Sequence, residues 1–70
     1  MKVDKRKINL AMMRACMNST DVAAAAGIPA VTVRKIMTGY GTTHKTLGRI
    51  ARALGVDPAE LIEEGDKAHA

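Results

Sequence analysis

The 70-residue sequence contains no Phe or Trp, and its one aromatic side chain is Tyr40. Proteins that recognise RNA or single-stranded DNA commonly stack bases on aromatic side chains. The composition therefore argues against those binding modes. A protein that reads duplex DNA through its grooves needs no such side chains, so this class remains open.

Cysteine and histidine are also scarce. Cys16 is alone, so no internal disulfide can form, and a reducing, intracellular setting is favoured. His44 and His69 are the only other soft metal ligands, and their spacing matches no zinc motif. No general base lies at a predictable distance from Cys16. We therefore expect no metal, no cofactor and no enzymatic activity.

Long apolar runs are absent, and nothing in the sequence has the length of a signal peptide or a membrane span. We expect a soluble protein of the cytoplasm. Seventy residues allow one domain with a small core. We assign residues 1–64 to this domain. Residues 65–70 read "GDKAHA", and these small and polar residues predict a flexible C-terminal tail.

The charges that are present are unevenly distributed. Residues 1–56 contain ten Lys or Arg and two Asp, whereas residues 57–70 contain one Lys and five Asp or Glu. A basic body with an acidic end is typical of a protein with a polyanionic partner, most often nucleic acid. Charge alone does not separate this interpretation from ordinary solvation.

Helix-capping residues recur along the chain and predict five short helices. Candidate N-caps are Asp4, Asn18, Thr43 and Asp57, and the last has Pro58 in the first helical position and Glu60 to complete a capping box. Gly27 and Gly55 mark helix ends. The helices are expected after Asp4, over about 19–26, over 30–38, after Thr43 and after Asp57.

The segment 30–38, "AVTVRKIMT", also has the β-branched residues of a strand. No second strand-like segment exists to pair with it, so its backbone hydrogen bonds favour a helix. Val33, Ile36 and Met37 then share one face. Similar spacing places Ile8, Ala11, Met12 and Ala15 on one face of the first helix, and Leu47, Ile50, Ala51 and Leu54 on one face of the fourth.

The second and third helices, joined by a short turn at Gly27, predict a helix-turn-helix unit. Ala23 and Ala26 would let two helices approach closely, and Ile28 would fill the space beneath the turn. Val33 and Ile36 suit the buried face of the third helix. Its other face is then free for the major groove of DNA.

Two segments, "NSTDVAAAAGIPAVTVRKIMTG" and "TLGRIARALGVDPAELI", resemble the helix-turn-helix of the lambda-repressor and Cro group, the Xre-type regulators. The resemblance covers about residues 8–62. Its most specific parts are "VAAAAGI", "TVRKI" with Gly39, and "IARALGVDPAEL". It implies an all-α, compact five-helix lambda-repressor-like domain that binds double-stranded operator DNA and regulates transcription, as a repressor.

The resemblance also implies which residues contact DNA. Four positions of the third helix would face bases: Ala30, Val31, Arg34 and Lys35. Six positions would contact phosphates: Ser19, Thr32, Tyr40, Thr42, Thr43 and Lys45. Ala30 and Val31 stand where many relatives have polar residues, which implies contacts with thymine methyl groups.

Met12 and Met37 are a second departure from the family pattern. Many relatives carry a buried Arg and Glu at these positions, paired inside the domain. Both partners are apolar here, which is physically consistent because an apolar pair often replaces a buried ion pair without loss of stability. We expect Met12 and Met37 to touch.

Several interpretations remain open. A helical adaptor that binds a protein and has lost DNA binding is the alternative function. Lys2, Lys5, Arg6 and Lys7 form either a phosphate-binding arm or a solubilising terminus. Arg49 and Arg52 are expected on a solvated face. A weak homodimer, stabilised by DNA, would use Leu10 and Met13 or else Leu61 and Ile62.

Overall fold

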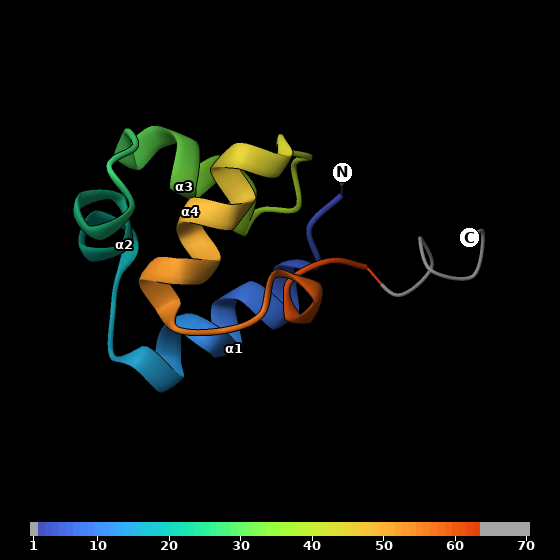
Figure 1. Ribbon diagram of the computed structural model, residues 1–70, viewed down its shortest axis with the longest axis horizontal. Coiled ribbons are helices and arrows are strands. Elements are labelled where there is room, and N and C mark those ends of the chain that lie inside the picture. The colour runs from blue at the N-terminus through green and yellow to red at the C-terminus, as the bar shows by residue number, and fades with distance from the viewer. Residues whose placement is uncertain (1, 64–70) are drawn as a thin grey trace.

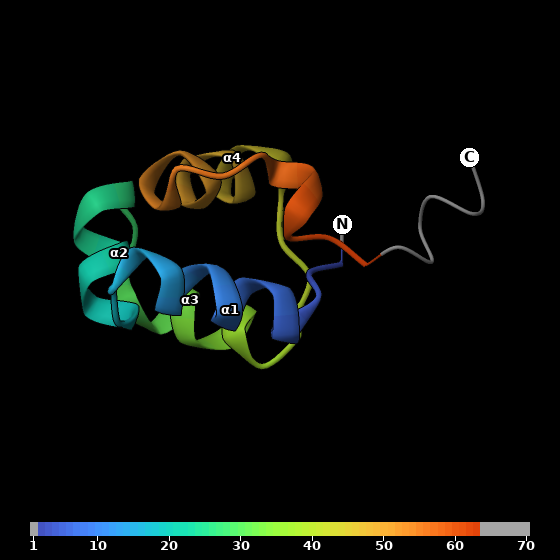
Figure 2. The same cartoon turned by 90° about the horizontal axis from the view of Figure 1, so that it is seen from below.

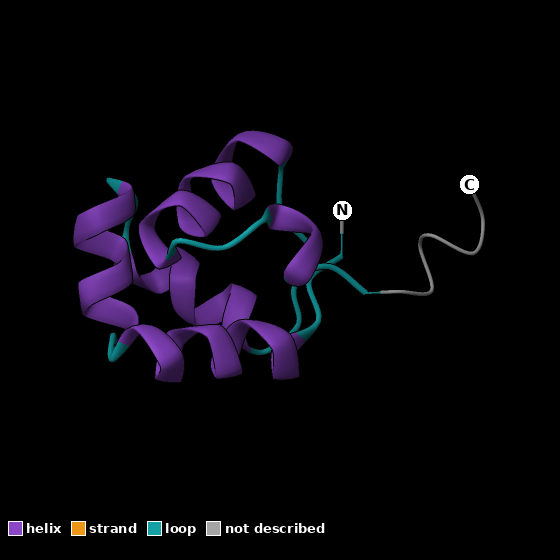
Figure 3. Cartoon of the chain, turned by 60° about the horizontal axis from the view of Figure 1, so that its bottom comes forward, coloured by secondary structure: helices purple, strands orange, loops and turns teal. Residues whose placement is uncertain are grey.

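The computed structural model describes residues 2–63. Over this range it contains four α-helices, a short 3₁₀ helix and no β-strand (Figures 1 and 3). The elements are α1 (Lys5–Ala15), α2 (Ser19–Ala26), α3 (Ala30–Met37), α4 (His44–Leu54) and η1 (Pro58–Glu60). The expectation of an all-α fold is confirmed. The proposed tail at 65–70 and the domain limit at residue 64 lie outside the described residues.

The prediction of a fifth α-helix is wrong. The capping box of Asp57 and Glu60 forms, but only the three residues of η1 follow it. Beyond η1 the backbone pairs with the N-terminal segment: the Asp4 amide donates to the Leu61 carbonyl at 2.8 Å, and Val3 and Ile62 form an isolated antiparallel bridge. These bonds occupy the groups that another helical turn would need, so the helix stops.

The caps of the remaining helices agree with the sequence predictions. Asn18 and Asp21 form a reciprocal capping box at the start of α2, and Thr43 caps α4. Gly27 adopts φ 72° at the end of α2, a left-handed conformation that glycine tolerates. The segment that could have been a strand is α3. The capping residues therefore predicted most helix ends correctly, because the hydrogen bonds at a helix end join residues that are close in the sequence.

The helices form two layers, with α4 on one side, α1 and α3 on the other, and α2 closing one end (Figure 2). α2 packs against both α3 and α4. The core between the layers is apolar, and no polar or charged residue of the described part is buried. Its largest fully buried side chains are Val3, Ile8, Val22, Val33, Ile36, Leu47, Ile50 and Leu61.

Candidate nucleic-acid interface

α3 has one buried side and one exposed side. Val33 and Ile36 are fully buried, as expected. Val31 is 52% exposed, and Arg34 and Lys35 are exposed beside it. The structure therefore brings Val31, Arg34 and Lys35 together on one outward surface. Ala30 is half-buried and packs against the core, so its methyl group lies at the edge of that surface.

The turn before α3 holds this helix against α2. The amides of Gly27 and Ile28 both donate to the Ala23 carbonyl, at 2.9 and 3.1 Å. Ala23 and Ala26 are buried in the core, and Ile28 is half-buried against it. The turn at Gly27 is as expected, whereas the role of the two alanines in the approach of α2 and α3 stays a prediction. The turn fixes the start of α3 while its outward side stays free.

The residues expected to bind phosphates precede α3, belong to it or follow it in the sequence. Their side chains differ in exposure. Ser19 is the first residue of α2 and is half-buried, as are Thr32 and Thr42. Tyr40 is 63% exposed in the loop after α3, and Lys45 is exposed in the first turn of α4.

Thr43 has a structural role that affects its availability. Its hydroxyl oxygen accepts from the Thr46 amide at 3.3 Å, and the hydroxyl donates to Thr46 Oγ1 at 3.1 Å. The side chain therefore caps α4 and has less hydrogen-bonding capacity left for a phosphate. The cap stabilises the start of α4, where Lys45 stands.

The charges of this surface are uncompensated. Within residues 2–63, Arg34, Lys35 and Lys45 make no ion pair. An exposed cation without a carboxylate partner is available for a phosphate or for the O6 and N7 acceptors of guanine.

Within residues 2–63, no helix is long and apolar enough to cross a membrane.

Sequence reasoning missed Asn9. Its side-chain amide donates to the Lys5 carbonyl at 2.6 Å and to the Met37 carbonyl at 3.3 Å. The second bond satisfies a carbonyl at the end of α3, which has no partner within its own helix. Asn9 therefore ties α1 to the end of α3. The one available signal was its position three residues before Met12, on the same side of α1.

Met12 is 4% exposed, and Met37 is half-buried against the same core. Met12 belongs to α1 and Met37 ends α3, two helices that contact each other and that the Asn9 bond to the Met37 carbonyl also joins. The direct contact of the two methionines stays a prediction.

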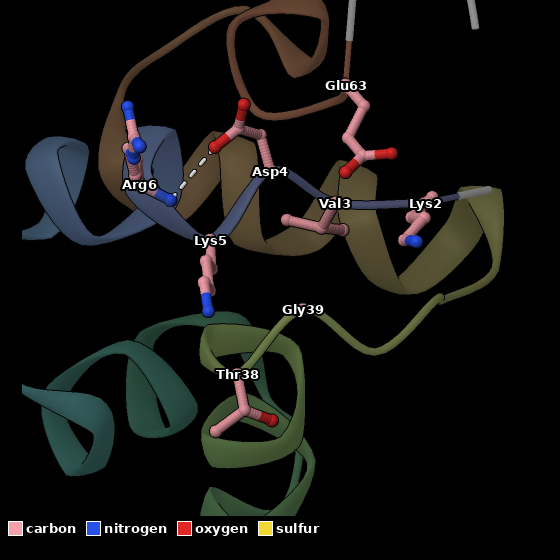
Figure 4. A pocket seen from close by; sticks show the side chains of 8 residues that line it. All are labelled: Lys2, Val3, Asp4, Lys5, Arg6, Thr38, Gly39 and Glu63. Carbon is pink, nitrogen blue, oxygen red and sulfur yellow. Dashed lines mark hydrogen bonds between the residues drawn. The ribbon is translucent and has the colours of Figure 1, made fainter. Parts of the chain in front are cut away.

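The N-terminal segment borders the far end of α3 (Figure 4). Val3 is 1% exposed and the Glu63 amide donates to the Lys2 carbonyl at 3.3 Å, so residues 2–4 are held in place and are not a free arm. A cavity of about 400 Å³ lies between this segment and the end of α3. Lys5 points toward Thr38 across it. Its lining residues are Lys2, Val3, Asp4, Lys5, Arg6, Thr38, Gly39 and Glu63.

The carboxylate of Asp4, which lines this cavity, already accepts hydrogen bonds from the backbone. It accepts from the amides of Arg6 and Lys7, at 2.9 and 3.2 Å, and so caps α1. The side chain of Lys7 turns away to donate to the Ile62 carbonyl at 3.2 Å. Lys2, Lys5 and Arg6 therefore remain as exposed cations beside the end of α3.

Three solved structures share the fold at 24% sequence identity. They are PhpD with cadmium atoms and PhpD with cadmium and hydroethylphosphonate, each with a TM-score of 0.76, and a mutant of hydroxyethylphosphonate dioxygenase, with a TM-score of 0.79. Each match covers 90% of this chain and 14% of the other, so the chain spans about a seventh of those proteins. At this identity the likeness concerns the fold alone.

A profile of the Cro/C1-type HTH DNA-binding domain matches residues 7–64. No curated protein matches the chain in sequence. The matched range includes α2, α3, α4, η1 and all of α1 except its first two residues. The chain therefore belongs to the Cro/C1-type HTH DNA-binding domain family.

Proposed function

We propose that the chain is a sequence-specific regulator of transcription that binds double-stranded DNA and represses by occupying an operator. The observation that carries this proposal is the surface of α3. Its apolar side is buried in the core, and its other side offers Val31, Arg34 and Lys35 without any ion-pair partner in residues 2–63. In this family architecture such a surface fits the major groove.

Within this proposal, α3 reads bases and its surroundings hold the backbone. Arg34 or Lys35 donates to guanine, and Val31 contacts a thymine methyl group, with Ala30 at the edge. Phosphate contacts position the domain and carry no sequence information. They come from Ser19, Thr32, Tyr40, Thr42, Thr43 and Lys45.

Selection from a pool of random duplexes tests the proposal. We expect the full chain to enrich a short motif, because each good bidentate contact with a base discriminates by about 1–3 kcal/mol. The enriched duplex should then bind more tightly than a scrambled duplex of equal length at the same salt concentration. A pool that remains random after repeated rounds would contradict sequence-specific binding.

A helical adaptor is the second candidate function, and exposed apolar side chains away from α3 favour it. Leu10 and Met13 on α1 are 44% and 68% exposed. The salt dependence of duplex binding separates the two functions. A DNA-binding protein releases one set of counterions for each phosphate that it neutralises, so its affinity falls steeply with salt. An adaptor would show weak binding with a shallow slope.

We also propose a weak homodimer that forms on DNA. Of the two surfaces considered, Leu61 is fully buried and Ile62 is half-buried, so that pair has little apolar surface to offer. Leu10 and Met13 remain exposed, and Leu10 also lines a groove of about 540 Å³ between α1 and η1. Sedimentation with a long duplex tests this: a strict monomer, free and bound, would refute the dimer.

The proposed activity has no catalytic step and uses no metal or cofactor. A regulator that works by binding an operator acts where the chromosome lies. We accordingly propose that the protein acts in the cytoplasm, on nucleoid DNA, and not at a membrane.

A further inference from the structure

α4 carries a second cationic surface, of which the proposed function uses Lys45 alone. Its buried side consists of Leu47, Ile50, Ala51 and Leu54. Four residues on its outward side are exposed and basic in type. We call this surface the α4 outer face, and its members are His44, Lys45, Arg49 and Arg52, with Gly48 among them.

The outer face is hollowed. His44, Lys45, Gly48, Arg49 and Arg52 line one cavity of about 380 Å³. Arg49 and Arg52 also line an adjoining cavity of about 410 Å³, together with Ala25, Ala26 and Ala53. The other lining residues of the second cavity are all alanines, so only small side chains lie beside the two arginines there.

Among the described residues, no negative charge balances this surface. Neither cavity is lined by Asp or Glu, and within residues 2–63 Lys45, Arg49 and Arg52 make no ion pair. Lys45 and Arg49 are four residues apart on one helix, a spacing at which like charges destabilise the helix. A ligand with several negative charges would relieve this repulsion.

The surface has the composition of a phosphate-binding site more than of a protein interface. The large exposed apolar side chains of the described residues are Leu10, Met13, Val31 and Tyr40, and none belongs to α4. Protein interfaces have an apolar centre. Contacts with a DNA backbone are made by Arg, Lys and small polar groups and need no such centre.

Beyond Lys45, the outer face belongs to another layer than the helix that would read DNA. α4 and α3 lie in different layers, and each buries its apolar side in the core (Figure 2). Arg49 and Arg52, on the exposed side of α4, therefore face away from the layer that contains α3. A duplex seated on α3 leaves Arg49 and Arg52 free.

We propose that the α4 outer face binds the phosphate backbone of a second DNA duplex, so that one domain bridges two duplexes. This inference rests on the proposed function, because α3 must hold the first duplex. Arg49 and Arg52 supply the contacts specific to the second site. They act by charge, without reading sequence.

The test uses the full chain, an immobilised 20-base-pair duplex that carries the sequence enriched by selection, and a second, fluorescent duplex of the same length and of random sequence. The wild type should retain the fluorescent duplex. Arg49→Gln/Arg52→Gln should still bind a single duplex through α3 and lose about tenfold of the bridging, with a salt slope shallower by about two. Arg34→Gln/Lys35→Gln should also lose bridging, because it weakens the other site.

The matched control is Arg14→Gln, which removes an exposed cation from α1 and should bridge like the wild type. Thermal unfolding of Arg49→Gln/Arg52→Gln should show a midpoint no lower than that of the wild type, which separates lost binding from lost folding.

Three results would overturn the proposal. One is wild-type protein that binds single duplexes but never bridges them. Another is undiminished bridging by Arg49→Gln/Arg52→Gln, which would assign bridging to a dimer that uses two α3 surfaces. The last is retention of labelled poly-glutamate in place of the second duplex, which would assign the face to an acidic protein. Failure to bind any duplex would instead remove the proposed function itself.

Discussion

At the scale of single residues, substitution of Arg34 or Lys35 should affect DNA binding differently from substitution of Lys45. Arg34→Ala or Lys35→Ala should cost about 1–3 kcal/mol on the best site and relax the preference at one base pair. Lys45→Ala should weaken selected and scrambled duplexes alike and reduce the salt slope by about one. Titrations of both duplexes at several salt concentrations measure these effects.

The control for this comparison is Arg14→Ala, which removes a charge far from α3 in sequence and should change neither quantity. If both Arg34→Ala and Lys35→Ala keep the full sequence preference, α3 is not the reading helix. The adaptor function would then be favoured.

Cys16 is the one described residue other than glycine with a positive φ. It ends α1 at φ 57° and ψ 41°, a left-handed conformation that is unfavourable for a side chain with a Cβ. The side chain is exposed, so little packing is lost on its removal. Cys16→Gly should therefore stabilise the fold by about 1 kcal/mol, measured by urea unfolding.

Cys16→Ala is the matched control because it removes the sulfur but keeps the Cβ. It should leave the free energy of unfolding nearly unchanged. Equal stabilisation by both substitutions would show that the thiol, and not the backbone angle, is the unfavourable feature.

At the scale of secondary-structure elements, the contact between α1 and α3 helps to hold α3, the helix proposed to read bases. Met12 of α1 is buried and Met37 of α3 is half-buried. Met12→Arg should destabilise the protein by about 3–5 kcal/mol if the charge stays buried and unpaired. Adding Met37→Glu should recover much of that loss, because the new carboxylate can pair with the arginine.

A double-mutant cycle measures this coupling from the free energies of unfolding of the two single variants and the double variant. Coupling of about 0.5–3 kcal/mol is expected for residues in contact. Simple additivity would mean that the two side chains do not interact and that Met12 and Met37 do not take the place of the family's ion pair.

At the scale of the whole molecule, the two ends of the described chain hold each other. Val3 is buried, the Asp4 amide bonds the Leu61 carbonyl, and the Glu63 amide bonds the Lys2 carbonyl. Val3→Ala removes two buried methyl groups and should cost about 1–3 kcal/mol. For a domain of this size that is a large share of its total stability.

Amide hydrogen exchange shows which segments this loss of stability affects. In Val3→Ala the amides of Asp4 and Glu63 should both exchange faster, because their bonds join the same two segments. Met13→Ala, at an exposed position of α1, should leave both amides protected. Faster exchange at one end alone would show that the two segments open independently.

The sequence by itself determined the parts of the structure that depend on neighbouring residues. Asn18 with Asp21, Gly27 and Thr43 act within one helical turn, so their backbone hydrogen bonds could be read from spacing alone. The period of the apolar residues predicted the buried sides of α3 and α4, and with them the outward position of Val31, Arg34 and Lys35.

Only the tertiary structure decided the parts that depend on distant segments. The capping box at Asp57 predicted a helix, but hydrogen bonds between residues 2–4 and 61–63 ended it after one 3₁₀ turn. The bond from Asn9 to the Met37 carbonyl joins residues 28 positions apart, and the separation of the α3 and α4 surfaces follows from the layers in which they lie. Such contacts form where packing brings together two segments that are distant in the sequence. The spacing of neighbouring residues does not predict which segments these are.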